Sequence, residues 1–117
     1  MGLRRHPRPT RAVARLPAAA DLPSGAMLQV IGARLWVDAG AAGWRPIADL
    51  PPGPLWPSPE GLPDGAMLQV ITALWHVETA AGWRPTTTQP PAVAAPDAAS
   101  SADGAMPLVL NNRWSFV

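Results

Sequence analysis

Leu-Pro-Ser-Gly-Ala-Met-Leu-Gln-Val-Ile, residues 22–31, decides the fold, because it returns at residues 62–71 with one change, Ser to Asp. Nine identities in ten at an offset of 40 residues identify an internal repeat. A third copy begins with Asp-Gly-Ala-Met at residue 103 and continues to Val117. The chain therefore contains two full units and one shorter unit of a single small motif.

The motif is typical of short antiparallel strands. Leu-Pro-(Ser/Asp)-Gly predicts a turn, since proline fixes φ and glycine accepts a positive φ. Proline cannot donate a hydrogen bond to a continuing ladder, so the Arg-Pro dipeptides should end the third strand of each full unit. The expected strands cover residues 26–31, 35–38 and the region of Trp44 in the first unit, and residues 66–71, 74–78 and the region of Trp83 in the second. We predict a mainly β protein of tandem small hairpin or meander units, joined by proline-rich extended linkers, with little helix.

The offset between the two full units changes from 40 to 39 residues. Leu35-Trp36 matches Leu74-Trp75, and the segment around Trp44 matches that around Trp83, both at 39. We place the lost residue between Ile31 and Leu35, where it would shorten the turn between the first two strands. In this alignment Trp36 corresponds to Trp75, Trp44 corresponds to Trp83, and Trp114 continues the first series.

The composition changes along the chain predict its organisation. The segments are a basic arm (1–20), a first β repeat (21–47), a proline-rich linker (48–61), a second β repeat (62–86), a proline- and alanine-rich linker (87–102) and a truncated third repeat (103–117). Trp56 lies within the first linker. It either packs back on a unit or presents a docking peptide to a partner.

A single unit is too small to fold alone. Leu, Ile, Val and Phe supply only 24 of 117 residues, there is no cysteine, and each unit is shorter than the roughly 40 residues that a domain without disulfides or metals needs. The strand at 26–31 is largely apolar on both faces, which predicts that both are covered. The cover could come from the neighbouring unit, from the same unit in symmetry-related chains, or from a larger assembly. We favour a homo-oligomer, specifically a trimer. The third unit lacks the Gly-Trp-Arg-Pro segment, so it is either a terminal cap or takes its last strand from elsewhere.

Positive charge is concentrated at the start of the chain. Residues 1–15 carry a net charge of +5, and residues 16–117 carry four Arg and eight acids, a net charge of −4. This arm either docks on an acidic surface or is a solvated tail. Its arginines are Arg4, Arg5, Arg8, Arg11 and Arg15. We do not favour nucleic acid as the partner, and no stretch is long and apolar enough to span a membrane.

The sequence offers little for catalysis. No cluster of His, Asp or Glu has metal-ligand spacing, so we expect no metal or cofactor. Ser24, Asp21 and His76 lack the surroundings of a hydrolase triad, and the second repeat has Asp64 in place of that serine. We therefore expect a protein that is not an enzyme. The candidates for binding or for core packing are Trp36, Trp44, Trp75, Trp83 and Trp114, together with Arg45 and Arg84.

The Gly-Ala-Met-Leu-Gln-Val strand, the Trp-bearing strand and the Gly-Trp-Arg-Pro close together resemble the short hairpin repeats of fibre, spike and baseplate-associated proteins in tailed bacteriophages and gene transfer agents. The resemblance covers residues 22–47, 62–86 and 103–117. It implies a virion structural protein (tail fibre, spike or decoration) that binds other particle proteins and contributes to assembly or host attachment. The alternative is a carbohydrate or cell-wall binding module of a bacterial envelope protein, which would bind a surface glycan at the cell surface.

Overall fold

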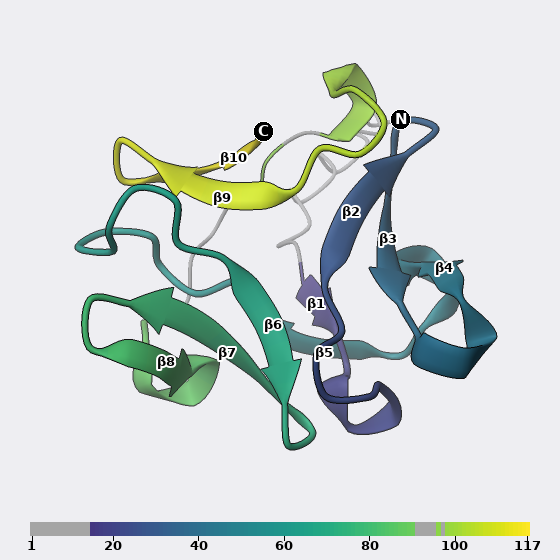
Figure 1. Ribbon diagram of the computed structural model, residues 1–117, viewed down its shortest axis with the longest axis horizontal. Helices are drawn as coiled ribbons and strands as arrows, with labels where there is room; N and C mark the ends of the chain where they lie inside the picture. Colours follow the sequence, from purple (N-terminus) through teal and green to yellow (C-terminus); the bar gives the residue numbers. More distant parts are fainter. Residues whose placement is uncertain (1–14, 91–95, 97) are drawn as a thin grey trace, which may run out of the picture.

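The computed structural model describes residues 15–90, 96 and 98–117, and this part of the chain is mainly β, as predicted (Figure 1). Its helical segments are single 3-10 turns of three residues each. The elements are β1 (Arg15–Pro17), η1 (Ala19–Asp21), β2 (Leu28–Ile31), β3 (Arg34–Asp38), η2 (Gly40–Ala42), β4 (Trp44–Pro46), η3 (Ile47–Asp49), β5 (Pro52–Leu55), β6 (Leu68–Ile71), β7 (Leu74–Thr79), β8 (Gly82–Pro85), η4 (Thr86–Thr88), η5 (Ala98–Ser100), β9 (Pro107–Leu110) and β10 (Arg113–Phe116).

Each unit contains a hairpin with a two-residue turn. The turns are Gly32-Ala33 between β2 and β3, Thr72-Ala73 between β6 and β7, and Asn111-Asn112 between β9 and β10. All six residues have positive φ, between 51° and 65°. Positive φ at both central positions defines the type I′ turn, whose twist matches that of the flanking strands. In the two full units a third strand follows, β4 or β8, and ends at proline as the sequence predicts.

The strand register shows that the lost residue was placed wrongly. Ile31 pairs with Arg34 across the first turn, and Ile71 pairs with Leu74 across the second, so both turns have two residues. The offset of 40 therefore continues through the second strand. The difference falls in the next loop, where four residues separate Ala39 from Trp44 but only three separate Thr79 from Trp83.

This register also corrects the correspondence between tryptophans. Trp36 pairs with Gln29, as His76 does with Gln69, so Trp36 is equivalent to His76 and not to Trp75. Trp75 pairs with Val70, and Trp114 pairs with the equivalent Val109. A shift of one residue turns a side chain to the opposite face of a sheet, because successive residues alternate in direction. Trp75 and Trp114 are thus one series, and its member in unit 1 is Leu35, which pairs with Val30.

The three units close into a ring (Figure 1). Their first strands, β2, β6 and β9, each use one edge for their own hairpin and the other for the Gly-Ala of a neighbouring unit. Val70 N donates to Ala26 O at 3.0 Å, Val109 N to Ala66 O at 3.0 Å, and Val30 N to Ala105 O at 2.8 Å. Reciprocal bonds run from Gly25 N, Gly65 N and Gly104 N to the carbonyls of the same three valines, at 2.6–2.7 Å. Unit 1 therefore contacts unit 2, unit 2 contacts unit 3, and unit 3 contacts unit 1.

Side chains repeat this cyclic connection. In each unit, the residue before the repeated Gly (Gly25, Gly65 or Gly104) accepts a hydrogen bond from the hairpin turn of the next unit. Ser24 Oγ accepts from Thr72 N at 2.9 Å, Asp64 Oδ1 from Asn111 N at 3.1 Å, and Asp103 Oδ1 from Gly32 N at 2.7 Å. The Ser or Asp at this position therefore fastens one unit to another, which explains why a serine and a carboxylate are interchangeable there.

The first linker segment (48–61) contributes to the fold. Its residues 52–55 form β5, which pairs with β1. The Trp56 side chain is 1% exposed and meets the Trp114 ring edge to face, with centroids 5.9 Å apart and an interplanar angle of 64°. Trp56 therefore packs back on a unit, the first of the two alternatives for this residue.

One continuous core is shared by all three units. It includes Leu28, Val37, Leu68, Val70, Val77, Val109, Trp56, Trp75 and Trp114, with Leu16 and Leu22 from the preceding segment. Along β2, Leu28 and Val30 are fully buried, whereas Gln29 and Ile31 on the other face are half-buried. The sequence left three possible sources of cover for the apolar strands. In the structure, the neighbouring units of the same chain cover the buried face of β2.

Candidate functional site

Two tryptophans of equivalent position lie at the surface of the protein, on the outermost strands of their sheets. Trp44 on β4 is 39% exposed, and Trp83 on β8 is 37% exposed. Their equivalence, unlike that of Trp36 and Trp75, is confirmed by the register. Since aromatic rings usually supply the core of a small domain, these two exposed rings are candidates for contact with a partner.

Each exposed tryptophan has an acidic residue as its cross-strand partner on the neighbouring strand. Asp38 pairs with Trp44, and Glu78 pairs with Trp83. Directly opposed residues of an antiparallel pair lie on the same face with their Cβ atoms about 4.5–5.5 Å apart. Asp38 Oδ1 also accepts a hydrogen bond from Gly40 N at 2.9 Å, which restrains the carboxylate. We call these two sets, Asp38 with Trp44 and Glu78 with Trp83, the Trp–acid pairs.

Sequence reasoning found the tryptophans of these pairs and missed the acids. The signal was present in the sequence, because an acid precedes the tryptophan by six residues in unit 1 and by five in unit 2. The one-residue difference coincides with the loop in which the structure places the deletion. Both units therefore place an acid opposite the exposed tryptophan, although the connecting loop is one residue shorter in unit 2.

The arginines that follow these tryptophans point to the other face of the sheet. Arg45 pairs with Val37 and Arg84 pairs with Val77, both with exposed side chains. Neighbouring residues on a strand alternate in direction, so each arginine is not beside the tryptophan that precedes it. The structure thus separates the Trp and Arg candidates of each unit, which the sequence had grouped.

The remaining tryptophan candidates are partly or wholly buried. Trp75 is 1% exposed, and its indole N–H donates to Pro17 O at 2.6 Å. Trp114 is 7% exposed, and its N–H donates to Pro57 O at 2.8 Å. Trp36 is half-buried, with its N–H donating to Ile31 O at 2.9 Å. Trp75 and Trp114 serve the core, where each fastens a hairpin to the segment preceding another unit.

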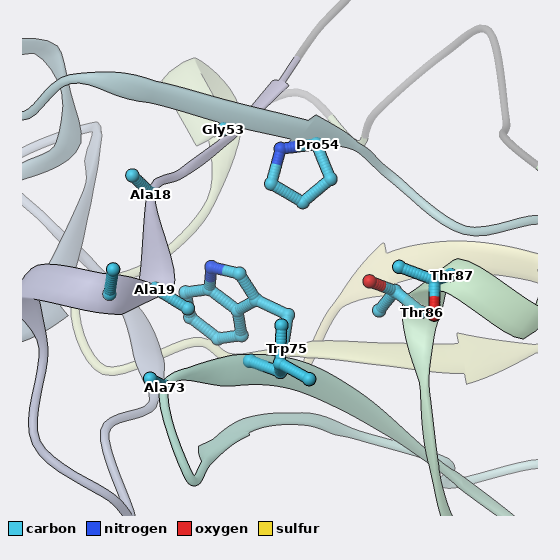
Figure 2. A pocket seen from close by; sticks show the side chains of 10 residues that line it. Ala18, Ala19, Gly53, Pro54, Ala73, Trp75, Thr86 and Thr87 are labelled. Carbon is cyan, nitrogen blue, oxygen red and sulfur yellow. The ribbon is translucent and has the colours of Figure 1, made fainter.

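A small apolar pocket lies over Trp75 (Figure 2). Its volume is about 280 Å³, and its walls are formed by Ala18, Ala19, Ala20, Gly53, Pro54, Ala73, Leu74, Thr86 and Thr87. The threonine hydroxyls are the only polar side-chain groups in this lining, because the Trp75 N–H is already bonded to Pro17 O. The lining contains no titratable side chain.

The structure places the other sequence candidates apart from the Trp–acid pairs. Arg15 lies on β1, where its guanidinium donates to Gly53 O at 3.1 Å, whereas Arg4, Arg5, Arg8 and Arg11 lie outside the described residues. His76 Nδ1 lies 3.0 Å from Leu74 O. Ser24 Oγ is bonded to the Thr72 amide as described above. Among residues 15–90, 96 and 98–117, no group of three or more His, Asp or Glu side chains could hold a metal ion.

In the part of the chain that the structure describes, no helix has the length and apolar character required to cross a membrane. Comparison of the chain with protein-family models, with curated proteins and with solved structures gave no match.

Proposed function

We propose that this chain is a non-enzymatic structural protein of a phage-like particle, located in the virion, where it contributes to particle assembly or host attachment as part of a tail fibre, spike or decoration. The observation that carries the proposal is the closed ring of three repeats. A ring whose units cover one another is a stable platform, and its exposed strands are available to partners.

The positive and negative charges of the chain are concentrated in different segments. The arm carries +5 within residues 1–15, and the rest of the chain carries −4. Opposite charges on two parts of one chain favour different partners, because each is attracted to a surface of complementary sign. In this proposal the arm docks on an acidic particle surface, and the ring projects away from it.

Particle association tests the proposal directly. Particles from the encoding bacterium or phage are sedimented through a density gradient with the purified protein, and the bound fraction is measured by immunoblot. We expect the native chain to co-sediment and a variant with Arg4, Arg5, Arg8 and Arg11 changed to Gln to remain at the top of the gradient. If neither the native chain nor the variant sediments with the particles, a particle location is rejected.

The trimer remains part of the proposal and is testable separately. The sequence favoured it because a unit needed cover, and the ring supplies that cover within one chain. A trimer would therefore form through outer surfaces of the ring. Size-exclusion chromatography with light scattering distinguishes a monomer of 12.3 kDa from a particle of three times that mass.

The Trp–acid pairs favour the second candidate function, a carbohydrate or cell-wall binding module at the bacterial cell surface. The negative face of an exposed indole attracts the C–H groups of a sugar ring. An adjacent carboxylate accepts hydrogen bonds from sugar hydroxyls. Trp44 with Asp38 and Trp83 with Glu78 present this combination twice.

Tryptophan fluorescence tests this candidate. Saccharides and cell-wall fragments are titrated against the native chain, against Trp44→Ala and Trp83→Ala, and against Leu74→Ala as a control for loss of a different exposed apolar side chain, 48% exposed. Glycan binding should weaken in both tryptophan variants and persist in the control. A further variant carries both Trp44→Ala and Trp83→Ala. Unchanged glycan binding by this double variant would reject the Trp–acid pairs as the site.

A further inference from the structure

Each Trp–acid pair belongs to a row of three side chains that crosses its sheet. Asp38 N donates to Met27 O and Glu78 N donates to Met67 O, both at 3.0 Å. Each acid therefore lies opposite a methionine on one side and opposite a tryptophan on the other. Opposed residues project from the same face of a sheet, so each carboxylate has a thioether and an indole as its neighbours. We call these sets the Met–acid–Trp rows: Met27, Asp38 and Trp44 in unit 1, and Met67, Glu78 and Trp83 in unit 2.

The acid and the tryptophan of each row stand at the closer of the two spacings found in antiparallel sheets. The Asp38 N–H points to Met27 and away from β4, so Asp38 and Trp44 form a non-hydrogen-bonded pair. Partners of this kind have Cα atoms about 4.5 Å apart, about 1 Å closer than hydrogen-bonded partners. The row of unit 2 has the same pattern. The carboxylate and the indole are therefore close enough to contact one ligand group together.

The arginine next to each tryptophan does not neutralise the carboxylate of the row. Arg45 and Arg84 project from the opposite face of their strands. Asp38 and Glu78 are half-buried, and the tryptophans beside them are exposed. The Gly40 N–H occupies one acceptor site of Asp38, whereas a carboxylate offers about four. Each row therefore presents a negative charge, flanked by two apolar groups, on an accessible face of the sheet.

This combination is complementary to a methylated ammonium group. The face of an indole attracts a cation, and the carboxylate supplies the opposite charge. The polarisable thioether of methionine packs against apolar groups such as N-methyl groups. An unmethylated ammonium is strongly hydrated and would lose water between the two apolar side chains. A methylated ammonium carries its charge inside an apolar shell, so it matches both the charge and the flanks of the row.

The row occurs twice, in units that present it on different sides of the ring. In Figure 1, β4 lies at the right of the ring and β8 at the lower left. Unit 3 has Met106 at the methionine position but Val117 at the acid position, so it lacks the charge. Two like sites on one molecule bind a polymer that repeats the recognised group more tightly than a single group, because the second contact is intramolecular. A glycan that is substituted along its length is such a polymer.

We propose that each Met–acid–Trp row binds a methylated ammonium group carried by a surface glycan. The indole face and the carboxylate hold the cation, and the methionine contacts its methyl groups. This inference rests on the second candidate function, since the same Trp–acid pairs are the site, and it specifies which group of the glycan they recognise.

Nuclear magnetic resonance of the nitrogen-labelled full chain tests the ligand class. The indole N–H signals of Trp44 and Trp83 report on the rows, and those of the core residues Trp75 and Trp114, whose N–H groups are bonded to backbone carbonyls, serve as references. The probes are choline, its uncharged analogue with carbon in place of nitrogen, and ethanolamine. We expect choline to bind between about threefold and thirtyfold more tightly than the uncharged analogue, from the attraction of the indole and of the carboxylate. Choline should also bind more tightly than ethanolamine.

A double variant removes the charges of the rows and keeps their shape. Asp38→Asn with Glu78→Gln retains the acceptor for the Gly40 N–H and should weaken choline binding by about twofold to fivefold. The matched control, Asp49→Asn with Glu60→Gln, removes two exposed charges outside the rows and should bind like the native chain. Equal choline affinity of the double variant and the native chain would overturn the proposal, as would equal affinity for choline and its uncharged analogue.

Polymeric probes identify the carrier and separate this inference from the function on which it rests. Chitosan bearing trimethylammonium groups is compared with uncharged chitin oligomers and with phosphatidylcholine vesicles, and the trimethylated chitosan should bind more tightly than choline. If uncharged saccharides shift the Trp44 and Trp83 signals and the methylated probes do not, this inference is overturned and the glycan-binding candidate stands. If no probe shifts them, both fail. Binding to the vesicles without binding to the trimethylated chitosan would overturn the proposal in favour of a membrane.

Discussion

The turn Thr72-Ala73 offers a direct test of the hairpin geometry through the double substitution Thr72→Asn with Ala73→Gly. Both residues have positive φ, 51° and 62°, and threonine is branched at Cβ. A left-handed conformation costs an ordinary L-residue roughly 1–2 kcal/mol, and Asn-Gly is the preferred pair for a type I′ turn. Glycine offsets part of the gain, because its greater conformational freedom in the unfolded chain lowers the free energy of unfolding by about 0.5–1 kcal/mol. The net expected stabilisation is about 1–2 kcal/mol.

Thermal unfolding followed by circular dichroism measures this effect. For a domain of this size, 1 kcal/mol corresponds to roughly 4–8 °C, so the double variant should melt about 5–15 °C above the native chain. The matched control is Asn112→Gly in the equivalent turn of unit 3, where Asn111-Asn112 already suits positive φ and the melting temperature should change little. The Thr72 amide keeps its bond to Ser24 Oγ in the variant, because that donor is in the backbone. An unchanged or lower melting temperature for the double variant would refute the type I′ assignment and the register built on it.

Three further substitutions test the ring. Trp56→Ala should lower the free energy of unfolding, measured in urea, by about 3–5 kcal/mol, because the ring is fully buried. A change below about 1 kcal/mol would show that Trp56 does not pack in the core. Gly53→Ala should destabilise by about 1–3 kcal/mol in the same assay, since a Cβ there would lie 2.8 Å from Pro17 O; native stability would show that β1 and β5 do not approach so closely. Asp103→Ala should speed hydrogen exchange at the Gly32 amide, its partner at 2.7 Å, and cost about 0.5–1 kcal/mol; unchanged exchange would show that this bond does not fasten unit 3 to unit 1.

The sequence by itself determined the repeat, the strands and their ends. Leu-Pro-(Ser/Asp)-Gly before an apolar run, and Arg-Pro after a short Trp-bearing run, are local signals whose meaning depends on the φ preferences and donors of those residues. Local signals of this kind suffice for the mainly β class and for the equivalence of Trp44 and Trp83. They also sufficed to show that a unit of this size needs cover.

Only the tertiary structure decided how the units pair and which partner covers them. Letter matching aligned Trp36 with Trp75, but the two-residue turn sets the register, and a shift of one residue moves a side chain to the other face. Trp56 stands among prolines, which gave no sign that its ring would meet Trp114 from a unit more than fifty residues later. Ring closure depends on hydrogen bonds between strand edges, whose backbone donors and acceptors are the same for every sequence. The pattern of side chains therefore predicted the parts, and the geometry of the backbone decided their assembly.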